Sequence, residues 1–456
     1  MSEPLIKVYK TSSGQLYAYD ALTNRIVTVD IGIGSHDPED AVKQYLLSGN
    51  IIKSVNFSKM QWQHTYDEYL TLLDEAIPSL LLQLTCRCNL SCDYCIYSGN
   101  YSHMRSHSMQ DMTESVLYKS IDFYALHNRA YNEARISFYG GEALFRFDLI
   151  KSAVKYARSM IQGKELNFSI STNGITLNRQ IAGWLAENPD VSITITINGP
   201  FQDKHRKTLS GDGSLSAIME NIYMLQNEFN YVWENQVRLI SNIVSSADLI
   251  PLRQFYNEQL LKAPEAVTNI GSEHGNQAIS KITAHDDMMS KECSATLQRE
   301  YFDTGDSFLT ACFGRSIAEL HNRPVYDGDD SAYMSTCLPG QVKLYVYADG
   351  KFGFCESVCD KITFGDLECG FDKNICKQIY EQARELFENQ CFNCWAQRLC
   401  KICLKDAFDS DGKLYQQMPQ HLCEKMQSST MEKMMLYCKI AENNPNMLDQ
   451  YKAKKA

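Results

Sequence analysis

Residues 84–95 have the sequence LTCRCNLSCDYC, and the cysteine spacing in this stretch decides how the rest of the chain is interpreted. Cys88, Cys92 and Cys95 follow a C-x3-C-x2-C pattern just after the apolar run at residues 80–84. A strand there would deliver three thiolates onto one short loop. Because a 4Fe-4S cluster normally takes four cysteine ligands, three from one loop would leave one iron free to chelate a small molecule.

The alternative for this loop is a zinc site, since zinc ribbons also use closely spaced cysteines. Such sites close with a fourth ligand, usually in a second cysteine pair, and the sequence has no such partner nearby. The ten histidines are scattered without an H-x-x-H pairing, so sulfur ligands dominate and an iron-sulfur cluster is favoured. Cys86 lies outside the spacing and is expected to be a small residue at the strand end.

The composition is that of an ordinary globular protein of two or three domains, with 456 residues, 44% apolar and 22% charged. Its 44 basic and 55 acidic side chains give a net charge of −11, which argues against nucleic acid or an anionic membrane as the main partner. No apolar run approaches the roughly 20 residues of a membrane span, and no signal peptide is recognisable. We therefore expect a cytoplasmic protein, whose 17 cysteines are better explained as metal ligands than as disulfides.

Residues 1–76 are expected to form a small winged-helix-like domain. Strand-like runs lie at residues 6–9, 15–19 and 25–29, and helical patterns follow at residues 37–47 and 66–76. Such a domain could bind a peptide that adds as a strand to an exposed edge, or it could simply pack against the rest of the chain.

Residues 77–290 alternate between strand and helix patterns. The predicted strands are residues 80–85, 135–139, 168–172, 192–197, 237–244 and 267–270, and the predicted helices are residues 114–128, 148–161, 178–187, 214–228 and 249–261. Runs that are apolar on both faces and separated by helices predict a parallel sheet. The predicted fold class is α/β, with a partial (β/α)6 TIM-type barrel whose site lies at the carboxyl ends of its strands.

The cysteine loop, with Tyr94 directly before Cys95, resembles the signature of radical S-adenosylmethionine (SAM) enzymes. The resemblance implies that Cys88, Cys92 and Cys95 hold a 4Fe-4S cluster whose fourth iron is completed by SAM, with Tyr94 beside the cofactor. It also implies reductive cleavage of SAM to a 5′-deoxyadenosyl radical, and therefore an electron donor such as flavodoxin or ferredoxin.

Gly140, Gly141 and Glu142 follow the second predicted strand and resemble the family's glycine-rich SAM contact. Glycine would let the backbone approach the amino group of SAM, and Glu142 would add negative charge near it. Ser171 and Asn173 end the third strand and could contact the ribose or carboxylate of SAM, although an Asx-type turn explains them equally well.

Thr196 ends the fourth strand, and Arg206 follows it. Relatives usually carry Ser and Asp where Thr196 and Asn198 stand, so no acid or base role is assigned here. Thr196 can still hydrogen-bond the cofactor, and Arg206 can pair with the SAM carboxylate or form a surface salt bridge. No catalytic side chain is assigned beyond the cluster ligands, and Asn242 is a weaker candidate for the same pocket.

The C-terminal third carries a second cysteine pattern. Cys337 and Cys355 belong to a C-x12-G-x4-C segment in which residues 344–347 and 351–354 would form a hairpin. The following cysteines, in a C-x2-C-x5-C-x2-C run and beyond it, are Cys391, Cys394, Cys400, Cys403 and Cys423.

This pattern resembles the SPASM extension, which houses two auxiliary 4Fe-4S clusters in peptide-modifying enzymes. The resemblance implies a distal cluster held by Cys391, Cys394, Cys400 and Cys423, and a near cluster held by Cys337, Cys355 and Cys403. The near cluster lacks an obvious fourth cysteine; Cys312 or Cys359 could supply it, or that iron could be open to a substrate thiolate. A pair of structural zinc sites is the alternative for this region.

The resemblance as a whole implies a radical SAM/SPASM peptide maturase with three 4Fe-4S clusters and SAM. The N-terminal domain, with residues 16–21 as its strand, would bind the leader of a ribosomally made, Cys-containing precursor peptide. Residues 291–336 would bridge to a SPASM domain at residues 337–440, followed by a tail at residues 441–456. The expected product is a thioether crosslink; alternatives are a carbon-carbon crosslink, formylglycine, or a non-catalytic metal-bound scaffold that holds a peptide.

Overall fold

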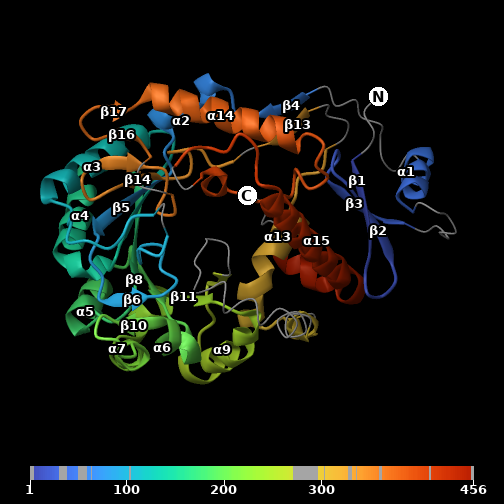
Figure 1. Cartoon of the computed structure of the whole chain (residues 1–456). Helices are drawn as coiled ribbons and strands as arrows, with labels where there is room; N and C mark the ends of the chain where they lie inside the picture. Colours follow the sequence, from blue (N-terminus) through green and yellow to red (C-terminus); the bar gives the residue numbers. More distant parts are fainter. Residues whose placement is uncertain are drawn as a thin grey trace.

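The computed structural model describes residues 5–29, 38–49, 59–62, 64–101, 104–270, 296–301, 303–326, 331–334, 336–358, 362–409 and 412–452. Within these residues, one ten-stranded sheet has the order β12-β11-β9-β8-β7-β5-β14-β15-β16-β17. Figure 1 shows the helices of the first half of the chain wrapped around the outside of this sheet, with the N-terminal strands β1–β3 on the far side of α13 and α15.

The first six strands of this sheet, from β12 to β5, are all parallel. They are β5 (Ser79–Thr85), β7 (Glu133–Gly140), β8 (Glu165–Thr172), β9 (Val191–Thr196), β11 (Val237–Ile243) and β12 (Ala266–Asn269). The connecting helices are α3 (Glu114–His127), α4 (Phe147–Met160), α5 (Arg179–Glu187), α6 (Gln202–His205), α7 (Leu215–Glu228), α8 (Asn230–Asn235) and α9 (Leu249–Phe255). The predicted partial (β/α)6 barrel is confirmed.

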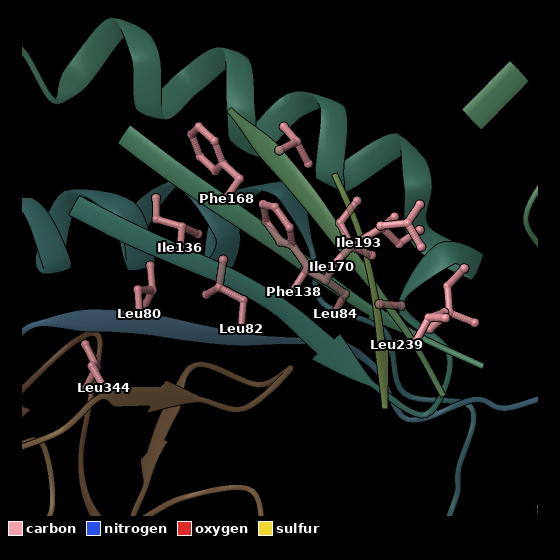
Figure 2. Close-up of a cluster of buried hydrophobic side chains, with 14 of the residues drawn as sticks. Leu80, Leu82, Leu84, Ile136, Phe138, Phe168, Ile170, Ile193, Leu239 and Leu344 are labelled. Atoms are coloured by element: carbon pink, nitrogen blue, oxygen red, sulfur yellow. The ribbon is translucent and has the colours of Figure 1, made fainter. Parts of the chain in front are cut away.

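The barrel strands are apolar on the face that meets the helices. Ile136, Phe138 and Ile170 are fully buried there, in the layer between sheet and helices that Figure 2 shows. Each such side chain contributes about 1.5–3 kcal/mol on burial. The opposite face is mixed, because Ser137 and Ser169 hydrogen-bond each other at 2.7 Å across β7 and β8 whereas Leu81 is buried against Tyr345 and Tyr347. The expectation of strands apolar on both faces therefore holds for β5, while β7 and β8 carry polar side chains on their second face.

The C-terminal half continues the barrel sheet. β14 (Leu344–Val346) pairs in parallel with β5, and β15 (Lys351–Gly353), β16 (Thr363–Asp366) and β17 (Gly370–Phe371) follow as antiparallel strands. The predicted hairpin therefore forms. β14 runs parallel to β5 and β15 runs back, so Cys355 leaves the hairpin toward the amino end of β5, whereas the hairpin turn lies toward the end that carries the first cysteine loop. Two long helices, α14 (Lys373–Cys391) and α15 (Gln420–Asn443), frame the remaining cysteines.

The N-terminal segment forms a separate three-stranded antiparallel sheet in the order β1-β2-β3. Its elements are β1 (Ile6–Lys10), β2 (Leu16–Asp20), β3 (Arg25–Val29), α1 (Pro38–Ser48) and α2 (Tyr66–Glu75). The sheet packs on the cysteine-rich half, where the Tyr9 hydroxyl lies 3.2 Å from the Cys438 sulfur on α15 and the Tyr19 ring meets Trp395 edge to face.

A further parallel pair joins β4 (Lys59–Trp62) to β13 (Ser331–Met334), and α12 (Ser307–Leu309) and α13 (Arg315–His321) precede β13. None of the described helices is both long and apolar enough to span a membrane.

Candidate active site

The first cysteine loop is held by a short ladder that sequence reasoning missed. β6 (Leu90–Cys92) pairs antiparallel with β10 (Arg206–Thr208), and this register sets Arg206 opposite Cys92. The ladder is only three residues long and has no alternation that a sequence pattern could reveal. Its consequence is that a basic side chain 114 positions downstream is fixed beside the cysteine loop.

One cavity of about 410 Å³ brings the predicted site residues together at the carboxyl ends of the barrel strands. Of the sequence-predicted residues, its lining includes Cys88, Cys92, Cys95, Tyr94, Gly140, Gly141, Ser171, Asn173, Thr196, Arg206 and Asn242. We call it the first cavity. Glu142 is the one predicted cofactor contact that the lining does not include.

Backbone N–H groups point at two of the three cysteine sulfurs. Leu90 N–H donates to Cys88 Sγ at 3.5 Å, and Tyr97 N–H donates to Cys95 Sγ at 3.4 Å. Such hydrogen bonds to sulfur favour thiolates and tune iron-sulfur clusters. Burial raises the pKa of Cys88 to about 11 and that of Cys95 to about 12, so metal binding at neutral pH must release protons from these thiols.

The two glycines are required by the cysteine loop itself. A Cβ on Gly140 would lie 2.3 Å from Thr85 O, and one on Gly141 would lie 2.1 Å from Arg87 O. Both contacts are far inside van der Waals distance, and Gly140 also has a φ of +148°. The backbone of β7 therefore packs directly under the loop, in addition to lining the first cavity.

Glu142 is fully buried behind the cavity wall. Its carboxylate accepts hydrogen bonds from Thr172 Oγ1 at 2.7 Å, Asn173 N at 2.8 Å and Leu144 N at 3.1 Å. Burial raises the pKa of Glu142, although the three hydrogen bonds oppose that shift. Glu142 thus fixes the end of β8, which presents Thr172 and Asn173 to the cavity.

Replacing Glu142 with Gln should disturb this wall, because the new amide NH2 would face N–H donors in place of an acceptor. We expect the free energy of unfolding to fall by about 1–3 kcal/mol and SAM affinity to fall with it. Urea unfolding and SAM binding to the reconstituted protein would measure both effects. Glu165→Gln is the control, since Glu165 is exposed at the start of the same strand; equal behaviour of the two variants would contradict the assignment.

Arg206 is a buried cation at the cavity wall. Its Nη1 donates to Thr196 O at 2.7 Å, which ties β9 to the cysteine loop. Burial alone would lower the pKa of Arg206, but the neighbouring Tyr94, Cys92 and Cys88 outweigh burial and raise it. A surface salt bridge for Arg206 is therefore wrong, and its charge is available to an anion in the cavity.

Asn198 is buried and connects the end of β9 to the cysteine loop and to β11. Its Nδ2 donates to the Tyr94 hydroxyl at 2.7 Å, and its Oδ1 accepts from Asn242 N at 2.9 Å. Because this geometry uses the amide as donor and acceptor at once, an amide suits the position better than a carboxylate.

The first cavity also contains residues that sequence reasoning missed. Tyr97 and His107 follow the cysteine loop, whereas Ser357 and Lys405 come from the C-terminal half. Ser357 lies two residues after Cys355 and Lys405 two residues after Cys403, so proximity to predicted ligands was the available signal.

The C-terminal cysteines gather into the two predicted sets. Burial and, to a smaller extent, the neighbouring Cys394, Cys400 and Cys423 together raise the pKa of Cys391 to about 12. Burial also raises the pKa values of Cys337 and Cys355, and the neighbouring Cys403 contributes to both increases. The structure therefore places Cys391, Cys394, Cys400 and Cys423 in one group, the distal set, and Cys337, Cys355 and Cys403 in another, the near set.

Cys312 is not part of the near set. Burial raises its pKa to about 12, and its charged neighbours are Asp306 and Arg253, with the Tyr256 hydroxyl also nearby. All of these residues belong to the side of the molecule formed by α9 and α12. Cys359, the other candidate fourth ligand, lies outside the described residues.

The described residues contain no group of three Cys, His, Asp or Glu side chains close enough to hold a single metal ion. A tetrahedral zinc site, with Zn–S bonds of about 2.3 Å, needs its sulfurs about 4 Å apart. A cubane cluster binds each thiolate through a different iron and so needs wider spacing. Among these residues the cysteines thus do not form a preformed tetrahedral zinc site.

Comparison with known proteins agrees with this geometry. The Radical SAM superfamily pattern matches residues 82–235. The serine-type anaerobic sulfatase-maturating enzyme of Bacteroides thetaiotaomicron is 28% identical over 142 residues, which are 30% of this chain and 34% of that protein. The cysteine-type enzyme of Clostridium novyi is 26% identical over 194 residues, 41% of this chain and 49% of that one. The alignments thus span a third to a half of these curated relatives.

Among solved structures, native anSMEcpe with bound AdoMet and Cp18Cys peptide superposes with a TM-score of 0.58 at 18% identity, covering 82% of this chain and 99% of that one. This likeness concerns the fold. The chain contains a radical SAM domain, whose core is residues 82–235.

A radical SAM domain binds one 4Fe-4S cluster and SAM, and the first cavity fits both. Three cysteines with N–H groups aimed at their sulfurs supply the cluster ligands. The buried Arg206 would offer a cation to the SAM carboxylate, and Ser171 and Asn173 would offer polar groups from the same cavity wall.

Proposed function

We propose that the chain is a radical SAM maturase of a ribosomally made, Cys-containing peptide, and that it forms a thioether crosslink. The observation that carries the proposal is the shared wall of the first cavity. Cys88, Cys92 and Cys95 line it on the barrel side, and Ser357 and Lys405 bring the near set's segments to the opposite side. A peptide bound there would lie beside both cysteine sites.

When bound, the cluster and SAM supply the hydrogen-abstracting radical chemistry, and the protein supplies binding, orientation and charge. Lys405 has no ion-pair partner among the described residues, and the described residues that line the first cavity include no Asp or Glu. An unpaired ammonium in a site without carboxylates favours an anionic substrate group, such as the thiolate of a substrate cysteine. Tyr97 links the two sides, since its hydroxyl donates to Glu356 O at 2.7 Å, directly after Cys355.

Formylglycine formation is the second candidate, because the two curated relatives described above are sulfatase-maturating enzymes. The two reactions differ in the fate of sulfur. A thioether keeps the cysteine sulfur in the peptide while removing its alkylatable thiol, whereas formylglycine made from cysteine loses the sulfur.

The test is anaerobic reconstitution with iron and sulfide, followed by SAM, a reductant and the Cys-containing peptide encoded near the gene. The proposal expects 5′-deoxyadenosine together with a peptide that retains sulfur but no longer reacts with iodoacetamide. A peptide product that has lost its cysteine sulfur would instead support formylglycine formation. Deoxyadenosine without any peptide product from Cys-containing candidates would contradict peptide maturation.

We further propose that the N-terminal sheet binds the peptide leader. β2, which contains the strand suggested by the sequence, is paired on both sides, so an added strand can pair only with β1 or β3. α1 packs against β1, and among the described residues no strand pairs with the outer edge of β3. The edge of β3 is therefore our candidate for strand addition.

Proline substitutions at Val27 and Thr28 test this edge. Successive N–H groups of a strand point alternately to its two sides, so one proline removes a bond to β2 and the other removes an outward donor. We expect one variant to be destabilised by about 1–3 kcal/mol, and the other to melt normally but bind the leader at least 10-fold more weakly. Melting curves and leader titrations measure this. Normal leader binding by the stable variant would rule out strand addition at β3.

A further inference from the structure

Two residues just before Cys88 join the cysteine loop to the glycine wall of the first cavity. Gly141 N donates to Thr85 O at 2.9 Å, and Glu142 N donates to Arg87 O at 2.8 Å. These bonds, and the lack of a Cβ on Gly141, bring the end of β7 against the main chain of the loop. Thr85 and Arg87 therefore set how Cys88 lies relative to the wall that Gly141 forms.

The side chains of the same two residues converge on one carboxylate, that of Asp111. Thr85 Oγ1 donates to Asp111 Oδ1 at 2.5 Å, while Arg87 donates from Nε to Oδ1 at 3.0 Å and from Nη2 to Oδ2 at 2.6 Å. Arg87 N also donates to Thr85 Oγ1 at 3.1 Å, and Arg146 Nη1 lies 3.6 Å from Asp111 Oδ2. Because a bidentate arginine–carboxylate pair fixes direction as well as distance, Asp111 determines how residues 85–87 leave β5.

Asp111 is itself fixed, because it lies on a segment that returns antiparallel to the end of β5. Cys86 N donates to Gln110 O at 2.8 Å, and Met112 N donates to Leu84 O at 2.9 Å. These two bonds place Asp111 in a bridge opposite the last residue of β5. The carboxylate is therefore a fixed point against which the cysteine loop is set.

Neither Asp111 nor Arg87 lines the first cavity, so an effect of either side chain on SAM must pass through the main chain of the loop. The two side chains are 28% and 32% exposed, respectively. Ion pairs with this much exposure contribute little to folding stability. Stability and SAM binding can therefore be separated by experiment at this pair.

We propose that Asp111 is a positioning residue for SAM binding: it orients Thr85 and Arg87, and through them it sets Cys88 against the glycine wall. This inference depends on the cluster and SAM occupying the first cavity. It goes beyond the proposed function, since it is independent of the peptide and of the bond that is formed in it.

Asp111→Asn in the reconstituted full-length chain tests this role, because it keeps the size of the side chain, removes its charge and turns an amide NH2 toward a donor. SAM is titrated anaerobically by the change that it causes in the electron paramagnetic resonance spectrum of the reduced protein. We expect the Kd for SAM to rise about 5- to 10-fold with unchanged iron content. The KM for SAM in deoxyadenosine formation should rise by a similar factor, while kcat stays within about threefold of wild type.

Asp190→Asn is the matched control. Asp190 accepts from Arg158 Nε at 3.3 Å and from Nη2 at 2.5 Å, and the two side chains are 29% and 40% exposed. This pair resembles that of Asp111 and Arg87 but lies at the amino end of β9, at the edge of the sheet opposite the first cavity. Both Asn variants should show similar, small losses of melting temperature, and Asp190→Asn should keep the Kd for SAM within about twofold of wild type.

A Kd for SAM in Asp111→Asn within about twofold of wild type would overturn the proposal. Equal weakening in both Asn variants would overturn it as well, because it would indicate general destabilisation. If Asp111→Asn assembled no cluster, Arg87→Lys would decide, since it keeps the charge and loses the bidentate pair; wild-type SAM affinity in that variant would again overturn the proposal. These titrations contain no peptide, so their failure is distinguishable from a failure of the proposed peptide reaction.

Discussion

Replacing Cys88, Cys92 and Cys95 together with alanine is expected to reduce 5′-deoxyadenosine formation to background. All three thiols line the first cavity beside Arg206 and Gly141, and without them no cysteine remains for the cluster among the described residues that line it. We further propose that the distal and near sets each hold one 4Fe-4S cluster; the reconstituted variant should then lose about four of about 12 iron atoms per chain and keep those on the distal and near sets. Iron analysis and chromatography of deoxyadenosine measure both effects.

Cys86 provides a matched control within the same loop. It is buried, and its sulfur lies 3.2 Å from the side-chain amide of Gln83, but it does not line the first cavity. Cys86→Ala should therefore keep iron content and SAM cleavage within about twofold of wild type, since its role is packing at the end of β5. SAM cleavage that survives the triple substitution would show that the cluster is held elsewhere.

Sequence periodicity predicted the barrel well because local and tertiary preferences agree there. Residues 168–172 and 192–197 are β-branched and apolar on the face that the helices cover, so β8 and β9 form within a few residues of expectation. The pairing of β14 with β5 could not be predicted in this way. Register between strands 260 residues apart depends on tertiary packing, and three-residue strands carry almost no periodic signal.

The site was predictable to the extent that its residues lie at strand ends. Gly140, Ser171 and Thr196 line one cavity because parallel strands end at the same edge of a sheet. Glu142 was misplaced in the prediction, since sequence gives its position in the chain but not the direction of its side chain. Lys405 was missed because its place in the cavity depends on how the cysteine-rich segment folds back onto the barrel.

Substitutions in the near and distal cysteine sets should have different effects on peptide modification. Cys355→Ala removes a thiol of the near set, whose segments line the first cavity through Ser357 and Lys405, and Cys391→Ala removes one of the distal set. We expect Cys355→Ala to abolish peptide modification while SAM cleavage stays within about threefold of wild type, because the SAM-side ligands are untouched.

If each set holds one cluster, as proposed above, each of these substitutions should also lower the iron content from about 12 to about 8 atoms per chain. Cys369→Ser is the control, since Cys369 is exposed and belongs to neither set; it should retain all the iron. If the near set only stabilised the fold, Cys355→Ala and Cys391→Ala would lose modification in parallel with melting temperature. A loss of modification by Cys355→Ala at an unchanged melting temperature would instead show that the near set takes part in the reaction. Among the described residues, the near set is the one whose segments line the first cavity, where a bound peptide would touch them.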